Sequence, residues 1–257
     1  MDNFIEDPVI CFWDIETSVM DVQTFDIWRQ NIPIAAIKRD WNIICACWKF
    51  FGKKKVHSVS VLDDPDRFSR DIHDDYYVVK TIRDMLEGVD ILVHHYGDRF
   101  DLKKLNARII YHNLKPLPKI LTIDTKKEAS KVAKFTSNKL DWLGGQLVGE
   151  SKDKTDLQLW LDCAKGDAKA IKYMTKYCKQ DVSLLEKVYL RLRKYMKSHP
   201  NLAPIHSDNC PRCGSNDTII HKHRLMASGI QKPQRQCKNC GGYFTLKNSV
   251  GSPNSRL

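Results

Sequence analysis

The chain has 257 residues, enough for one large domain or two unequal ones. Its 42% hydrophobic and 28% charged residues are ordinary for a globular protein, and no apolar run is long enough for a membrane helix. The net charge is +11, and the segment from residue 205 onward carries eight Lys or Arg against two Asp or Glu. This basic balance favours a polyanionic partner such as nucleic acid. The N-terminal stretch MDNFIEDPVI does not resemble a signal peptide, so we expect a cytoplasmic protein.

Three apolar runs near the N-terminus are predicted to be strands: 9–17, 43–51 and 56–62. The sequence FFGKKKV supplies a turn between the second and third, which favours an antiparallel meander. The segment 18–41 is too long for a hairpin loop. We expect it to cross an edge or the active face of the sheet, where Trp28 and Trp41 would anchor it.

Strands and helices then alternate along the chain. The predicted elements are a helix over 74–89, a strand over 90–96, a helix over 100–114, a strand over 119–124, and helical segments over 137–148 and 167–196. This order indicates an α/β protein with a mixed sheet and helices on its faces. A Pro-containing polar stretch over 198–209 reads as a linker.

Two acidic residues interrupt the first apolar run, VICFWDIET. Asp14 and Glu16 are two residues apart, so a strand places them side by side on one face. Close carboxylates repel each other unless a positive charge lies between them. The alternative is a strand end whose acids simply face water.

Acidic residues also stand at two later positions. Asp101 opens a predicted helix directly after a strand, where an acid also favours the helix dipole. Tyr177 and Asp181 are four residues apart and share one helical face, which would also suit a solvated stripe.

In combination these residues resemble the three motifs of the DnaQ-like, or DEDD, 3′-5′ exonucleases in their tyrosine subclass. The motifs are Asp14-x-Glu16, Phe100-Asp101 and Tyr177-x-x-x-Asp181. The resemblance covers roughly residues 8–197, and the layout is similar to that of phage-encoded members, which would place the protein in a host cytoplasm. It implies a ribonuclease-H-like fold, an α/β mixed sheet flanked by helices.

The resemblance also implies two Mg²⁺ or Mn²⁺ ions, because hard carboxylate oxygens suit these cations. Asp14, Glu16 and Asp181 would hold the first ion. Asp14 would also contact the second ion, which Asp101 would bind. Tyr177 would orient the water that attacks the phosphodiester, and the metal would activate that water because tyrosine is a poor base at its usual pKa.

Contacts to the substrate are implied as well. Thr17 would lie close to the terminal nucleotide, and Lys139 would meet a phosphate unless it is a solvated lysine. The family usually has Asn after the His of its second motif, whereas His95 is followed by Tyr96 here. An alternative alignment uses His94 and His95 with one extra residue. The departure concerns the positioning of the substrate end near Tyr96 and leaves the metal-binding acid in place.

The nine cysteines form two groups. Five occur singly or in apolar surroundings and are predicted to be small core residues: Cys11, Cys45, Cys47, Cys163 and Cys178. The other four form two Cys-x-x-Cys-Gly units: Cys210, Cys213, Cys237 and Cys240. Four thiolates predict one tetrahedral structural Zn²⁺ site. A disulfide pair is the alternative, which suits a cytosolic protein less well.

Between the cysteine pairs, TIIHKHRL and KPQRQC read as basic strands. Their basic side chains, Arg224 and Arg235 among them, are expected either to contact a phosphate backbone or to face solvent. The module resembles zinc ribbons of transposases and phage proteins, which implies DNA binding.

These observations predict a nuclease domain over 1–200, a linker over 201–208, a zinc-ribbon nucleic-acid-binding domain over 209–250 and a tail over 251–257. The expected activity is metal-dependent 3′-5′ exonuclease cleavage of DNA, preferred over RNA, with replication or repair proteins as possible partners in trans. A structure-specific endonuclease on the same fold and a non-catalytic nucleic-acid-binding protein remain the alternatives.

Overall fold

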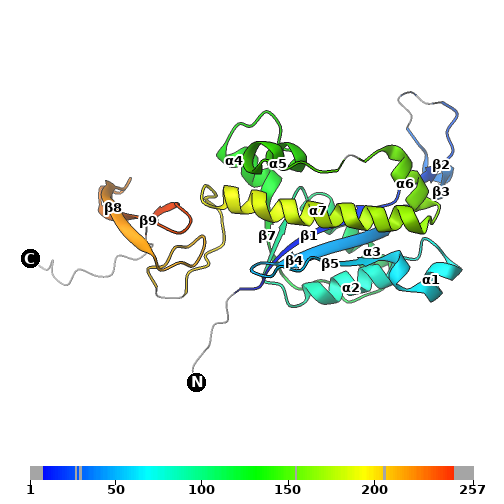
Figure 1. Ribbon diagram of the computed structural model, residues 1–257, viewed down its shortest axis with the longest axis horizontal. Helices are drawn as coiled ribbons and strands as arrows, with labels where there is room; N and C mark the ends of the chain where they lie inside the picture. Colours follow the sequence, from blue (N-terminus) through cyan, green and yellow to red (C-terminus); the bar gives the residue numbers. More distant parts are fainter. Residues whose placement is uncertain (1–7, 27, 29–30, 154, 205–206, 246–257) are drawn as a thin grey trace, which may run out of the picture. The chain divides into compact units, whose positions relative to one another are not determined.

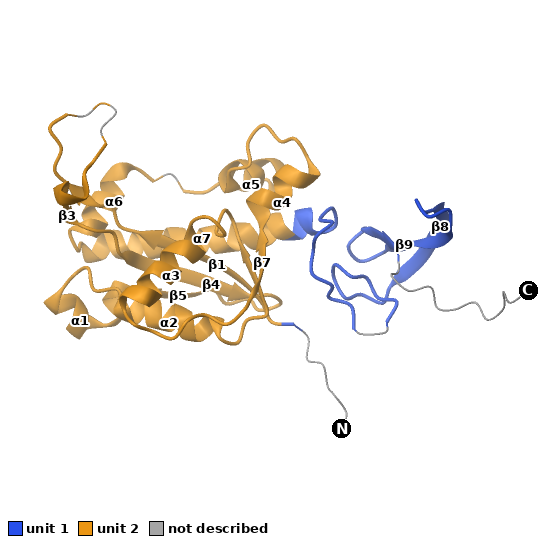
Figure 2. Ribbon diagram, turned by 180° about the vertical axis from the view of Figure 1, so that it is seen from behind, with its two compact units in different colours: residues 1–8, 190–257 blue, residues 9–189 orange. Residues whose placement is uncertain are grey.

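The computed structural model describes residues 8–26, 28, 31–153, 155–204 and 207–245. The chain divides into two compact units, one of residues 9–189 and one of residues 1–8 and 190–257, which Figure 2 colours separately. The domain boundaries expected from the sequence stay predictions, and the predicted tail lies outside the described residues. No helix in the described part of the chain is long and apolar enough to span a bilayer.

The larger unit alternates strands and helices in the predicted order (Figure 1). Its strands are β1 (Ile10–Thr17), β2 (Asp21–Val22), β3 (Ile37–Arg39), β4 (Ile43–Phe50), β5 (His57–Ser60), β6 (Ile91–His94) and β7 (Leu121–Asp124). Its helices are α1 (Pro65–Arg70), α2 (Tyr76–Leu86), α3 (Asp101–Tyr111), α4 (Thr125–Val132), α5 (Leu140–Val148), α6 (Leu157–Ala164) and the start of α7 (Ala168–Arg193).

A five-stranded mixed sheet in the order β5-β4-β1-β6-β7 forms the centre of this unit. The strands β5, β4 and β1 pair antiparallel, as the turn chemistry predicts, while β1, β6 and β7 pair parallel. The first apolar run of the sequence is therefore the middle strand. A fold of this kind, with helices on the sheet faces, confirms the α/β architecture predicted from the sequence.

The two faces of β1 pack against different helices. On one face the Phe12 ring lies 5.3 Å from the Tyr189 ring of α7. On the other face the Cys11 thiol lies 3.9 Å from the Met85 sulfur of α2. The five isolated cysteines are all buried, as predicted. Helix α7, the longest helix that the structure describes, runs along the sheet (Figure 1).

Some local elements differ from the prediction. The segment 18–41 contains a small hairpin, in which β2 pairs with β3. The third predicted strand stops at Ser60, because Ser60 and Asp63 form a reciprocal capping box that starts a 3₁₀ turn. The short helices α1 and α6 were not predicted.

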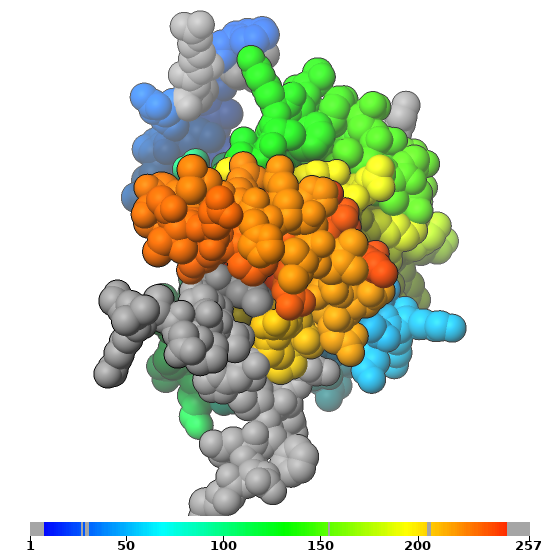
Figure 3. Space-filling view, turned by 90° about the vertical axis from the view of Figure 1, so that its left-hand side faces the viewer, coloured from blue at the N-terminus to red at the C-terminus, as the bar shows by residue number. Residues whose placement is uncertain are grey.

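The C-terminal unit contains a three-stranded antiparallel sheet in the order β10-β9-β8. These strands are β8 (Thr218–Leu225), β9 (Gln231–Cys237) and β10 (Tyr243–Thr245), and the first two match the basic strands predicted. The edge strand β8 is exposed along nearly its whole length (Figure 3, orange).

Candidate active site

Three carboxylates converge where β1 faces α7. Asp14 and Glu16 project from the same side of β1, and Asp181 reaches them from α7; one oxygen of each lies within 4.8 Å of the others. Helix α7 begins at a fixed point because the side chain of Asp167 accepts the backbone N–H groups of Lys169 and Ala170. The fold thus brings together three of the acids that the sequence motifs indicated, Asp14, Glu16 and Asp181.

Asp101 lies next to this group without joining the three-oxygen cluster. It is the first residue of α3 and is only 4% exposed. Its Oδ1 accepts a hydrogen bond of 3.4 Å from the backbone N–H of Ile15, the residue between the two acids of β1. Ile15 is itself buried. The fourth acid is thus tied to the backbone of the same strand.

Lys152 is a residue of this site that the sequence did not predict. Its Nζ donates to Asp181 Oδ2 at 2.5 Å and to the Tyr177 hydroxyl at 3.3 Å. The ammonium is largely buried, with 16% of the side chain exposed. Nothing in the charged stretch GESKDKTD distinguishes this lysine, because the contact joins a loop to a helix 29 residues away.

Burial and mutual repulsion raise the pKa values of the acids. Burial and the neighbouring carboxylates raise the pKa of Asp14 well above its usual range, and that of Glu16 to about 8. Burial raises the pKa of Asp101 to about 6 and also raises that of Asp181. Burial alone would lower the pKa of Lys152, but its attraction to Asp181 outweighs this and raises it. Without a metal the cluster keeps protons and one ammonium.

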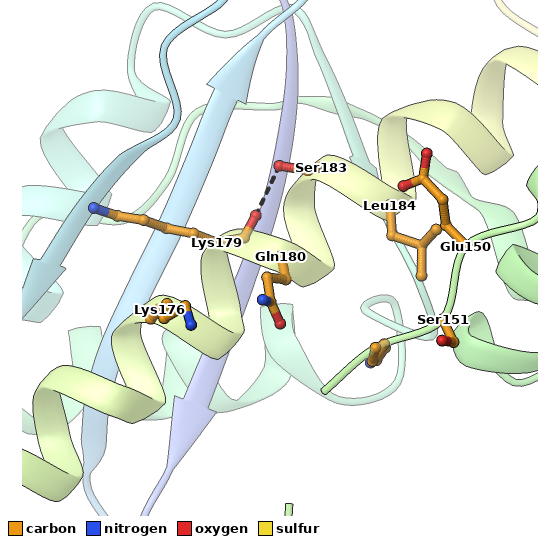
Figure 4. Close-up of a pocket in the computed structure, with 8 residues that line it drawn as sticks. Glu150, Ser151, Lys176, Lys179, Gln180, Ser183 and Leu184 are labelled. Atoms are coloured by element: carbon orange, nitrogen blue, oxygen red, sulfur yellow. Dashed lines mark hydrogen bonds between the residues drawn. The ribbon is translucent and has the colours of Figure 1, made fainter. Parts of the chain in front are cut away.

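The segment 149–153 carries Lys152 across α7 and is held at several points. Glu150 accepts from Lys187 at 2.5 and 2.7 Å. Asp153 accepts from Gln180 at 2.9 Å. A pocket of about 350 Å³ opens between this segment and α7, and Figure 4 shows its lining residues. The backbone that carries Lys152 is therefore held by contacts that do not involve the four acids of the site.

The loop before Asp101 has a constrained backbone. Tyr96, which departs from the motif that the sequence resembles, adopts the left-handed conformation with φ of 69°. Its backbone N–H donates to Asp124 Oδ1 at 2.9 Å, and the same carboxylate caps α4. The Tyr96 ring is 40% exposed and lies 3.8 Å from the Lys126 ammonium. Its side chain is thus accessible, while its backbone is fixed.

A second group, His94, Asp98 and Asp124, has the residue types of a metal site. The Trp13 indole N–H donates to His94 Nδ1 at 3.3 Å, so the neutral ring carries its proton on Nε2. That nitrogen lies 2.9 Å from Asp98 Oδ1 and donates to it. Both ring nitrogens are then occupied, so we interpret this group as a brace for the loop that leads to Asp101.

The other predicted substrate contacts take varied positions. Thr17 ends β1 at a register shift beside Ile43. Lys139 is exposed at the N-cap of α5. In the C-terminal unit Arg224 is exposed, while the Arg235 guanidinium donates to Asp208 at 2.8 Å and to Thr218 at 2.9 Å. These assignments stay predictions, although Arg235 already has partners of its own.

The four C-terminal cysteines come together around one point. The sulfurs of Cys210 and Cys240 are 3.7 Å apart, and those of Cys213 and Cys237 are 3.6 Å apart. No disulfide joins any two of them. Four sulfurs at about 2.3 Å from a tetrahedral Zn²⁺ would lie about 3.8 Å from one another. The cluster therefore fits a zinc ion better than the alternative of two disulfides.

Comparisons with known proteins agree with the fold. The family model described as the RNase_H superfamily matches residues 44–193, which include Asp101 and Asp181 but begin after β1. The family B DNA polymerase of the hyperthermophilic archaeon Pyrobaculum calidifontis is similar in structure, with a TM-score of 0.52 and 11% sequence identity. The match covers 76% of this chain and 27% of the polymerase, and at this identity it shows the fold alone. No curated protein matches the sequence.

Proposed function

Because the chain belongs to the RNase_H superfamily, we propose that it is a divalent-metal-dependent nuclease that removes nucleotides from the 3′ end of DNA. The observation that carries the proposal is the convergence of Asp14, Glu16 and Asp181 to within 4.8 Å, with Asp101 against the same strand. The tyrosine subclass is proposed from Tyr177, whose hydroxyl shares Lys152 with Asp181.

The acid cluster fits a hard divalent cation. It offers only carboxylate oxygens, which suit Mg²⁺ or Mn²⁺. Asp181 Oδ1 is buried and has no hydrogen-bond partner among the described residues, so one oxygen is left for a cation. Asp14, Glu16 and Asp181 would hold one ion, and Asp101 with Asp14 a second. Such ions supply an activated water and offset the negative charge of the phosphodiester.

The chain's own side chains would then act on the substrate and the water. Tyr177 would orient the attacking water through its hydroxyl. Lys152, whose ammonium lies between Tyr177 and Asp181, would offset negative charge beside the phosphate. The loop fixed by Asp124 would present the exposed Tyr96 ring to the substrate end.

We further propose that the four cysteines hold one structural Zn²⁺ and that residues 209–250 form a ribbon that binds nucleic acid. The sulfur distances support the metal. The exposed β8 strand, which carries Lys222 and Arg224, supports contact with a phosphate backbone.

One observation favours a second candidate, a non-catalytic nucleic-acid-binding protein. The Lys152 ammonium already balances part of the acid cluster, so the fold does not need a metal for charge balance alone. The two candidates differ in whether any phosphodiester is cleaved.

The test uses 3′- and 5′-labelled DNA and RNA strands with Mg²⁺ or Mn²⁺, and a matched variant with Asp14→Asn and Glu16→Gln. We expect stepwise shortening of DNA from the 3′ end, which the variant abolishes while keeping its zinc content and fold. Cleavage of circular single-stranded DNA would indicate an endonuclease instead. Absence of cleavage of every substrate by the wild-type protein would support the binding protein.

A further inference from the structure

A cation lies on an aromatic ring beside the start of α3. The ammonium of Lys104 is 3.6 Å from the centre of the Trp41 ring and 5.4 Å from that of Phe100. Distances of this size are typical of cation–π contacts, which hold a cation in place without neutralising it. The position of the ammonium is therefore defined by rings rather than by an acid.

The charge of Lys104 has no direct counterpart. Its ammonium forms no hydrogen bond or ion pair with any residue that the structure describes, although Asp40 is near enough to attract it. Partial burial lowers the pKa of Lys104. By contrast Arg108, one helical turn later, is bound by both oxygens of Asp75 at 2.7 Å. A partly desolvated ammonium without an acid is unfavourable unless an anion joins it.

This cation follows the fourth acid of the site along α3. Lys104 lies one turn after Asp101 in α3. Trp41 precedes Asn42, whose backbone exchanges hydrogen bonds of 2.9 and 3.0 Å with Ser18, directly after the end of β1. The ammonium is thus on the helix that Asp101 opens, and the ring lies in the loop before β4, one residue from a contact with the end of β1.

Aromatic rings and cations continue along the helix. The Arg108 guanidinium lies 4.2 Å from the Tyr111 ring, and Tyr111 is 72% exposed. Phe100 at the start of the helix is 39% exposed. From residue 100 to residue 111 the helix rises about 16 Å. A cation flanked by exposed rings suits a single strand, since a phosphate can meet Lys104 and a base can stack on Tyr111, whereas the charge of Arg108 is already balanced by Asp75.

We propose that the side of α3 that carries Lys104 and Tyr111 binds a single nucleic-acid strand. The strand would lead away from the acid cluster, with one of its internucleotide phosphates on the Lys104 ammonium. Trp41 is a positioning residue that holds the ammonium, and Tyr111 offers a ring to a base. The inference rests on the proposed function, because it names the form of nucleic acid that the same site receives.

The test measures binding rather than cleavage. Fluorescence anisotropy of short labelled DNA and RNA strands is recorded with the full-length protein, without Mg²⁺ or Mn²⁺, for the wild type, Lys104→Ala, Lys104→Arg and Trp41→Leu. Lys103→Ala is the matched control, because Lys103 is exposed on the neighbouring position of the same helix.

We expect Lys104→Ala to weaken single-strand binding about tenfold and to reduce the slope of log affinity against log salt by about 0.7, the value for one phosphate contact. Lys104→Arg should restore most of the binding, Trp41→Leu should weaken it, and Lys103→Ala should change it less than twofold. Unchanged affinity and salt slope in Lys104→Ala, or equal losses in Lys104→Ala and Lys103→Ala, would overturn the inference.

The proposed nuclease activity and the proposed strand path along α3 can be refuted independently of each other. Loss of binding in Lys104→Ala together with no cleavage by the wild type would refute the nuclease and leave the strand path supported. Normal cleavage together with unchanged binding in Lys104→Ala would refute the strand path and leave the nuclease supported. Comparison of DNA with RNA strands, and of single strands with duplexes, shows which form the surface selects.

Discussion

Replacing Glu16 by glutamine is expected to stabilise the protein when no divalent metal is added. Glu16 shares a partly buried site with Asp14 and Asp181, and burial and repulsion raise its pKa from 4.5 to about 8. Glutamine keeps the shape of the side chain and cannot ionise. The variant therefore removes the repulsion, and with it one of the oxygens proposed to bind the metal.

The sign and size of the effect follow from proton linkage. Since the pKa of Glu16 is higher in the folded than in the unfolded protein, its contribution is favourable below pH 4.5 and is lost as the pH rises toward about 8. At about 1.4 kcal/mol per pH unit this range sets an upper limit of about 5 kcal/mol. Because Glu16 is partly solvated and shares protons with its neighbours, we expect about 2 kcal/mol at pH 8, or about 4–8 °C in Tm.

Thermal unfolding between pH 5 and pH 8.5 measures the difference in stability between the wild type and Glu16→Gln. The buffer contains no added metal, and no chelator that would remove zinc from the cysteines. The advantage of Glu16→Gln should grow with pH, whereas Asp21→Asn, an exposed acid on β2, should show no such trend. Added Mn²⁺ should raise the Tm of the wild type more than that of Glu16→Gln. A variant less stable than the wild type at pH 8, or equally stabilised by Mn²⁺, would refute this reasoning.

Three further predictions concern other parts of the chain. A Cβ at Gly97 would lie 2.4 Å from Cγ of the His94 ring, so Gly97→Ala should lower the Tm by destabilising the loop before Asp101. Gly145→Ala meets open space inside α5 and should raise the Tm slightly, because alanine favours a helix over glycine. Asp75→Asn should lower the free energy of unfolding by about 3–5 kcal/mol in urea titrations, because Asp75 is fully buried and paired with Arg108. Burial alone would raise the pKa of Asp75, but hydrogen bonds from His112 and Arg108 outweigh it and lower the pKa, so the wild type loses this stability as the pH falls. Metal analysis of the wild type should find one zinc ion per chain, and Cys213→Ser should lose it, because one of four thiolate ligands is removed. An equal zinc content in the two proteins would contradict the four-cysteine site.

The sequence predicted best the long elements that show a clear pattern of apolar or charged side chains. The apolar runs of β1 and β4 are buried on both faces, so both strands stand within one residue of their predicted ends. Helix α3 begins at Asp101 as predicted, because an acid at the first position favours a helix. The spacing of Tyr177 and Asp181 placed them on one face of α7, where both contact Lys152.

Short elements and contacts between distant parts of the chain could not be predicted from such sequence patterns. The strands β2 and β3 have two and three residues, too few for any periodicity to be recognised. The 3₁₀ turn after β5 depends on the reciprocal bonds of Ser60 and Asp63, which compete with the strand. The position of Lys152 depends on how a loop crosses α7, and no local pattern encodes that crossing.

Lys152 also explains how the acids of β1 tolerate one another before any cation binds. The repulsion that the first strand implied is met by protons, since the pKa of Glu16 is about 8, and by one ammonium on Asp181 Oδ2. The other oxygen of Asp181 stays buried and without a partner among the described residues. Glu150 and Asp153 hold the segment 149–153 to α7 through Lys187 and Gln180, and none of these residues belongs to the acid cluster. The Lys152 side chain can therefore move away from the cluster while its backbone stays in place. A cation entering the cluster would therefore displace protons and an ammonium rather than refold a loop, which makes its binding favoured by higher pH.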